Sequence, residues 1–300
     1  MEERKTIYLC LAHMSETGEE QKYVKEAFDT NWVVPLGPNV NGFEDDLKAF
    51  VSKNSDGSEL SREVVALSAG TAAVHLGLLA SGVGPGDEVC VQSFTFCASS
   101  HPITYLGATP VFIDSEPDSW NMDPELLEKA IIDRKEKTGK YPKAIVPVAL
   151  YGMPYDCDKI MAISEKYGIP VVEDAAEGCG SRWKGQVLGT FGKFGVLSFN
   201  GNKMITTSGG GALICQDAES KNNVMWYATQ ARDAYPYYQH TAIGYNYRMS
   251  NVCAGIGRGQ MTVLEDHIAH HKHVQELYKE LLKDVEGVTL HEAPNADYDS

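Results

Sequence analysis

The feature that most constrains the fold of this chain is a regular alternation of short apolar runs with helical stretches between residues 64 and 214. Parallel strands need crossover connections, which are usually helices, so the alternation predicts an α/β fold with a mainly parallel sheet and helices on both faces. The predicted strands lie at residues 64–67, 88–91, 110–113, 144–148, 170–172 and 195–199.

The character of the sequence changes after about residue 240. Residues 1–240 are predicted to form one large α/β domain, in which residues 72–79 form a buried helix and Asp123 caps the helix that begins at Pro124. Apolar residues at helical spacing between 263 and 285 predict a long helix. Residues 241–300 are therefore expected to start a smaller C-terminal domain, which ends in a polar segment and is expected to be incomplete.

Charge and cysteine content limit the partners and the compartment. The chain has 41 acidic and 26 basic residues, a formal charge of -15, and no stripe of Lys or Arg, so nucleic acid is not an expected partner. Its 7 cysteines form no C-x-x-C motif, which favours a reduced cytoplasmic protein. The apolar stretch at residues 7–12 is too short for an export signal or a membrane span, so neither is expected.

An amine and a carboxylate follow two of the predicted strands. Lys203 precedes a glycine-rich run, residues 206–212, which is expected to be flexible, and Asp174 ends an apolar run. A lysine amine can form a Schiff base with the aldehyde of pyridoxal phosphate (PLP), and an anion can keep the pyridine nitrogen of PLP protonated. The pair therefore predicts a PLP site, although each residue alone also fits a simpler role, as a solvated loop lysine or a helix cap.

A turn of small residues connects the first predicted strand to the next helix. It includes Gly70 and Thr71, and it would direct backbone N–H groups and a hydroxyl toward one end of the sheet, as in a phosphate site. Tight strand-to-helix turns also use glycine and serine for packing, so this turn alone leaves both interpretations open. It matches neither a Walker loop nor a G-x-G-x-x-G fingerprint.

Several motifs, in order along the chain, resemble the DegT/DnrJ/EryC1/StrS family of PLP-dependent sugar aminotransferases. The resemblance implies the aspartate aminotransferase fold (fold type I), with a mainly parallel seven-stranded sheet and a small C-terminal domain. Members of the family usually continue for several tens of residues beyond the position of Ser300. The matching stretches are residues 68–73 (SAGTAA), 84–89 (GPGDEV), 93–96 (SFTF), 105–112 (YLGATPVF), 173–176 (EDAA), 198–203 (SFNGNK) and 244–250 (GYNYRMS).

The same resemblance assigns roles to individual residues. It implies that Lys203 forms the internal aldimine with PLP, that Asp174 pairs with the pyridine nitrogen, and that Phe96 stacks on the ring. For Phe96 the alternative is ordinary core packing, because aromatic residues beside strands are commonly buried.

Further residues are assigned to the cofactor phosphate. The resemblance implies that Gly70, Thr71 and Ser198 hold it, and that Asn246 reaches the phosphate of the neighbouring subunit's cofactor in a homodimer with a shared active site. A plain turn residue is the alternative for Asn246.

Glu177 is the clearest local clue to the substrate. Many family members have Gln or His at this position, beside the phenolic oxygen of PLP. An acid there must share a proton with that oxygen or be protonated itself, because two adjacent anions would repel. With Glu177 and the segment 198–203 (SFNGNK), the chain most resembles one branch of the family. That branch transfers an amino group from L-glutamate to the C4 ketone of UDP-linked 4-keto-6-deoxy-N-acetylhexosamines, on the way to bacillosamine-type sugars. The alternatives are another dTDP- or GDP-linked keto sugar, or a non-catalytic regulatory protein that keeps the PLP fold.

A metal site is not predicted. His267 and His271 lie four residues apart on the predicted long helix, but no carboxylate or cysteine completes a ligand set around them.

Overall fold

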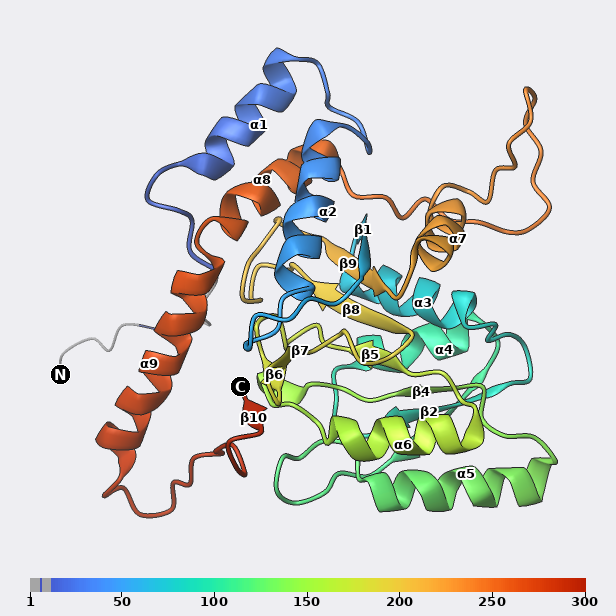
Figure 1. Ribbon diagram of the computed structural model, residues 1–300, viewed down its shortest axis with the longest axis vertical. Coiled ribbons are helices and arrows are strands. Elements are labelled where there is room, and N and C mark those ends of the chain that lie inside the picture. Colours follow the sequence, from blue (N-terminus) through green and yellow to red (C-terminus); the bar gives the residue numbers. More distant parts are fainter. Residues whose placement is uncertain (1–5, 7–11) are drawn as a thin grey trace.

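The structure is a computed structural model that describes residue 6 and residues 12–300 (Figure 1). Residues 1–5 and 7–11, on which the prediction of no export signal depends, lie outside the described residues. In the part of the chain that the structure describes, no helix is both long enough and apolar enough to cross a membrane.

Two sheets form the centre of the molecule. Strand β9 is antiparallel to both of its neighbours, whereas the other pairings in these two sheets are parallel. Isolated parallel bridges, Ile145 with Val171 and Val148 with Asp174, connect the facing edges of the two sheets. The strand order in the first sheet is β1 (Glu63–Leu67), β9 (Gly211–Cys215), β8 (Phe194–Ser198) and β5 (Val172–Asp174). The strand order in the second sheet is β3 (Thr109–Ile113), β2 (Glu88–Gln92) and β4 (Ala144–Val146).

Helices cover both faces of the sheets, because successive strand residues point to opposite faces. In β1, Val64 and Ala66 pack in one core cluster, and Val65 and Leu67 pack in the other. The first cluster includes residues of α2 (Pro38–Val51), α5 (Pro124–Thr138) and α6 (Cys157–Tyr167). The second includes residues of α3 (Gly70–Ala80), α4 (His101–Tyr105) and α7 (Ala218–Ala228). The predicted α/β class is thus confirmed.

Local sequence signals account for several of the element boundaries. The Asp123 side chain accepts hydrogen bonds from the backbone N–H groups of Glu125 and Leu126, so α5 begins where it was predicted. Helix α3 includes the predicted buried stretch, residues 72–79.

The glycine-rich run 206–212 is not flexible throughout, and this expectation was wrong for its last two residues. Gly211 begins the buried strand β9, and a Cβ atom there would lie 2.4 Å from the backbone nitrogen of Gly70. Glycine is needed at this position because two backbone segments approach closely, and not because the chain is mobile.

The C-terminal part contains the predicted long helix, α9 (Leu264–Leu282). Before it, α8 (Asn251–Met261) packs against α2 and α1 (Glu19–Asp29) at one end of the molecule (Figure 1). After α9 the chain returns to form β10 (Tyr298–Asp299), which pairs with β6 (Arg182–Trp183) of the hairpin that β7 (Gln186–Val187) completes. The domain boundary at residue 240 and the incomplete C-terminal domain stay predictions.

Candidate active site

Asp174 lies at the carboxyl end of β5 and is 6% exposed. Its Oδ2 accepts a hydrogen bond from Ser99 Oγ at 2.6 Å, and its Oδ1 accepts one from the backbone N–H of Ala176 at 3.2 Å. Burial raises the pKa of Asp174, and the two hydrogen bonds and the charge of Lys203 oppose this shift. A carboxylate that is buried and ionised favours a cationic hydrogen-bond donor as its partner.

Sequence reasoning missed Ser99. It ends a short 3₁₀ helix (Cys97–Ser99), and its backbone N–H donates to the carbonyl oxygen of Phe96 at 3.1 Å. The run of small residues around it carries no signal of a contact with a carboxylate 75 positions away.

Phe96 begins the same turn, and its side chain is 74% exposed. It therefore does not belong to the core, which leaves its ring exposed in the segment that precedes Ser99. Its stacking on the cofactor stays a prediction.

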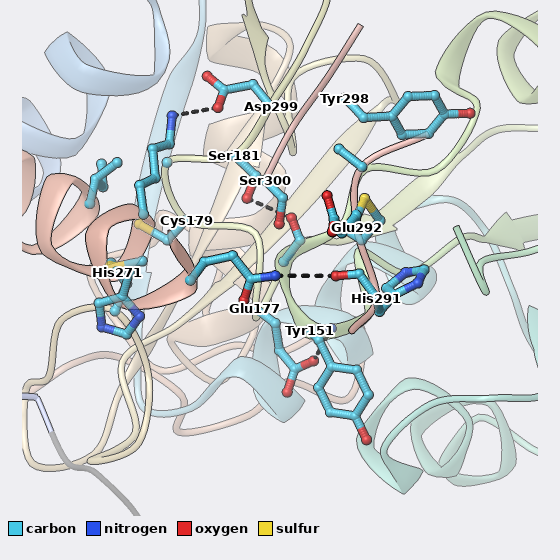
Figure 2. A pocket seen from close by; sticks show the side chains of 18 of the residues that line it. Tyr151, Glu177, Cys179, Ser181, His271, His291, Glu292, Tyr298, Asp299 and Ser300 are labelled. Atoms are coloured by element: carbon cyan, nitrogen blue, oxygen red, sulfur yellow. Dashed lines mark hydrogen bonds and ion pairs between the residues drawn. The ribbon is translucent and has the colours of Figure 1, made fainter. Parts of the chain in front are cut away.

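Lys203 lies in the loop that follows β8, and its side chain is only 16% exposed. Its Nζ is 3.2 Å from Oε1 of Glu177. The other oxygen of Glu177 accepts a hydrogen bond from the backbone N–H of Tyr151 at 2.7 Å (Figure 2). Lys203 is therefore a partly buried, paired lysine and not a solvated loop residue.

Tyr151 is a second residue that sequence reasoning missed. It lies in a 3₁₀ turn (Leu150–Gly152) with a φ of 53°, a left-handed conformation that is strained for a tyrosine. Its side chain is 68% exposed, so the ring is free to contact a ligand.

The N-terminus of α3 lies beside the end of β8, as a phosphate site requires. A Cβ atom added at Gly70 would lie 2.9 Å from Cβ of Ser198, so the two predicted phosphate residues are in contact. Thr71 is half-buried in the first turn of α3, and the described residues include no side chain that caps this helix. The open N–H groups of a helix N-terminus favour an anion.

Asn246 is exposed and forms an isolated antiparallel bridge with Thr229. The carbonyl oxygen of the next residue, Tyr247, accepts a hydrogen bond from the backbone N–H of Ser68 at 2.8 Å, beside the turn into α3. Asn246 thus lies on a segment that borders the predicted phosphate site of its own chain. Its contact with a second subunit stays a prediction.

Lys203 is one of the residues that line a pocket of about 780 Å³. Figure 2 shows this pocket from close by. Its walls include Glu177, Tyr151, Trp120 and residues of α9, among them His271. The ring of Trp120 stacks on His291 with centroids 4.0 Å apart. The pocket therefore offers aromatic faces and charged groups to a ligand that reaches Lys203. Among the described residues, no group of three or more His, Cys, Asp or Glu is placed to hold a metal ion.

The distribution of charge around these residues fits PLP. The buried carboxylate of Asp174 suits the protonated ring nitrogen, the close contact of Gly70 with Ser198 at the open end of α3 suits the phosphate, and the amine of Lys203 suits the aldehyde. An α/β chain with these groups at the carboxyl ends of its strands is a PLP-dependent transferase in class.

Comparison with known proteins identifies the family. The chain belongs to the DegT/DnrJ/EryC1/StrS aminotransferase family, whose model matches residues 14–300. The sequence predictions of this family, of PLP and of an aminotransferase are confirmed.

Three relatives show the extent of the similarity. The chain is 47% identical to the putative PLP-dependent aminotransferase EpsN of Bacillus subtilis (strain 168), over 95% of this chain and 70% of the relative. It is 37% identical to GDP-perosamine synthase of Escherichia coli O157:H7, over 91% of this chain and 71% of that protein. The crystal structure of a DegT DnrJ EryC1 StrS aminotransferase from Brucella abortus superposes with a TM-score of 0.86 at 31% identity, covering 95% of this chain and 73% of that one.

Proposed function

We propose that this aminotransferase moves an amino group from L-glutamate to the C4 ketone of a nucleotide-linked 4-keto-6-deoxy sugar, for the biosynthesis of a surface polysaccharide or glycan. The observation that carries the proposal is that Lys203 and its partner Glu177 are both among the residues that line a pocket of about 780 Å³. This volume lies in the range of small-molecule sites.

The residues of the chain divide the chemistry between them. PLP supplies the electron sink that stabilises negative charge at the reacting carbon. Lys203 Nζ removes the proton from Cα of the amino donor and, in the second half of the reaction, delivers a proton to C4 of the sugar. Asp174 keeps a positive charge at the ring nitrogen, and the Ser99 hydroxyl holds the carboxylate in the required orientation.

Glu177 orients Lys203 through the contact at 3.2 Å. Because it also holds the backbone of Tyr151, the same carboxylate positions the aromatic wall of the pocket. Aromatic faces in a pocket suit the apolar C–H surface of a sugar ring, and the neighbouring polar groups suit its hydroxyls.

The specific substrate that we propose is a UDP-linked N-acetylhexosamine derivative. Glu177 supports it, through its similarity to the bacillosamine-type branch. The 37% identity to a GDP-perosamine synthase favours a GDP-linked keto sugar as the second candidate.

The remaining features of the proposal concern assembly and location. We propose a cytoplasmic homodimer with a shared active site, in which Asn246 reaches the second cofactor. The charge of -15 argues against nucleic acid as a partner.

An assay of the two half-reactions tests the proposal. L-glutamate should convert the bound PLP to its amino form with release of 2-oxoglutarate, and a UDP-linked 4-keto-6-deoxy-N-acetylhexosamine should convert it back. If only a GDP-linked keto sugar, and not the UDP-linked one, converts the amino form back to PLP, the result would support the second candidate. If the purified protein binds PLP but no amino acid converts the PLP to its amino form, the result would support a non-catalytic role and overturn the proposal.

A further inference from the structure

Three segments that are distant in the sequence contact the loop that bears the reactive lysine. This lysine loop is defined as residues 199–207. The carbonyl oxygen of Gly201 accepts the backbone N–H of Ala12 at 2.9 Å, and that of Met204 lies 3.1 Å from Nδ1 of His267. The third contact is a hydrogen bond of 3.2 Å from the backbone N–H of Thr206 to Oε1 of Gln260 in α8.

Gln260 is completely buried, and its amide has a hydrogen-bond partner on each side. Nε2 donates to the carbonyl oxygen of His13 at 2.8 Å and to Oε1 of Glu20 at 2.7 Å. The opposite orientation of the amide would place two donors together at Thr206 and an acceptor against two acceptors at His13 and Glu20, so the network determines the orientation.

Glu20 is a suitable anchor for this amide. Its side chain is buried between α1 and α8, and its two oxygens also accept hydrogen bonds from the backbone N–H and the Oγ of Ser15, at 2.8 Å and 2.6 Å. Gln260 therefore connects the lysine loop to a carboxylate that is itself held in place.

Glycines in α8 make this arrangement possible. A Cβ atom at Gly259 would lie 2.4 Å from the backbone nitrogen of Glu20, and one at Gly255 would lie 3.2 Å from the backbone carbonyl carbon of Tyr23, both residues of α1. The close approach of α1 to α8 thus depends on the missing side chains, and it brings Glu20 within reach of Gln260 (Figure 1).

We infer that Gln260 is a positioning residue for Lys203: it connects the lysine loop to the N-terminal segment, residues 12–20, and so sets the place of the reactive amine. The effect on catalysis rests on the proposed function. The claim that Gln260 holds the lysine loop does not depend on it. Loss of the amide would leave the buried N–H of Thr206 without an acceptor and free the loop on one side.

The test begins with Gln260→Met, which keeps the length of the side chain and removes its three hydrogen bonds. Hydrogen exchange at the Thr206 amide, measured on the full chain with and without PLP, should become at least about tenfold faster. The kcat per bound PLP should fall about tenfold, with the KM for the amino donor nearly unchanged, because placement of the amine affects proton transfer more than donor binding.

A control variant separates positioning from general loss of stability. Leu127→Ala opens a cavity in the core beneath α5 and should lower the melting temperature without changing exchange at Thr206 or kcat per bound PLP.

The outcomes are distinct. Unchanged exchange at Thr206 in Gln260→Met, or the same fall in kcat in Leu127→Ala, would each overturn the inference. If the wild-type protein transfers no amino group, the proposed function fails, whereas the exchange measurement still decides whether Gln260 holds the loop.

Discussion

The amine of Lys203 lies 3.2 Å from the carboxylate of Glu177, and this carboxylate also binds the backbone of Tyr151. The reactive group and the strained wall of the pocket are therefore connected through one side chain. A conservative change at position 177 separates these two contacts, because glutamine can still accept one hydrogen bond but carries no charge.

For Glu177→Gln we expect the enzyme to stay active, with kcat reduced by no more than about tenfold, because the contact with Tyr151 is retained. For Glu177→Ala we expect a loss of about 10²-fold, since both Lys203 and the Tyr151 turn lose their partner. Steady-state kinetics of both variants at saturating PLP test this. Equal activity of the alanine variant and the wild type would show that the bridge has no role in catalysis.

Lys203→Ala should abolish the visible absorption of the lysine-bound cofactor and its trapping by borohydride, and activity should fall by about 10⁴-fold. Mass spectrometry after reduction checks the first result, because wild-type protein should carry the cofactor on the peptide that contains residue 203. The exposed Lys166, which pairs with Glu128, provides the control, and Lys166→Ala should behave as the wild type. Trapping that persists in Lys203→Ala would place the reactive amine elsewhere.

Asp174→Asn should retain PLP but lose turnover by about 10²–10³-fold, since a neutral amide does not stabilise the charge on the ring nitrogen. Turnover per bound cofactor is the measurement. Near-normal rates in this variant would refute the pairing of Asp174 with the ring.

The stability of the cofactor-free protein should show the cost of burying Asp174. Burial raises its pKa in the folded state above the ordinary value of 3.8, so the folded chain binds the proton more tightly than the unfolded chain does. The stability due to this group is present below about pH 3.8 and is lost as the pH rises through the folded pKa. Without PLP, Asp174→Asn should therefore melt at a higher temperature than the wild type at pH 7.5, and the difference should shrink toward pH 4. Calorimetry across this range decides, and a difference that does not depend on pH would contradict the expectation.

Gly70→Ala should weaken the binding of PLP about tenfold, because the added Cβ would lie 2.9 Å from Cβ of Ser198 and must displace the predicted phosphate site. Titration of the cofactor-free protein with PLP gives the affinity. The matched control is Gly84→Ala, where an added Cβ meets open space among the described residues. An unchanged affinity in Gly70→Ala would separate Gly70 from the phosphate.

Much of the fold could be predicted from local sequence. The alternation between residues 64 and 214 predicted the α/β class, and Asp123 before Pro124 predicted the start of α5. Strand β9 escaped prediction because its glycine suggested mobility, whereas the glycine permits a close contact with α3 that no local pattern reports.

The positions of Asp174 and Lys203 could also be predicted, since each follows a recognisable strand, and their chemical roles stay predictions. Their partners could not. Ser99 bonds to Asp174 across 75 positions, and Gln260 bonds to Thr206 across 54.

The sequence by itself therefore determined the kinds of element, the family and the amine and carboxylate that we propose carry the chemistry. The tertiary structure alone decided which side chains hold these two groups: Ser99 on the carboxylate, Glu177 on the amine, and Gln260 on the lysine loop. The physical reason is the range of the forces involved. Helix and strand preferences arise within a few residues, whereas these hydrogen bonds depend on the order of the strands and on how closely the helices pack.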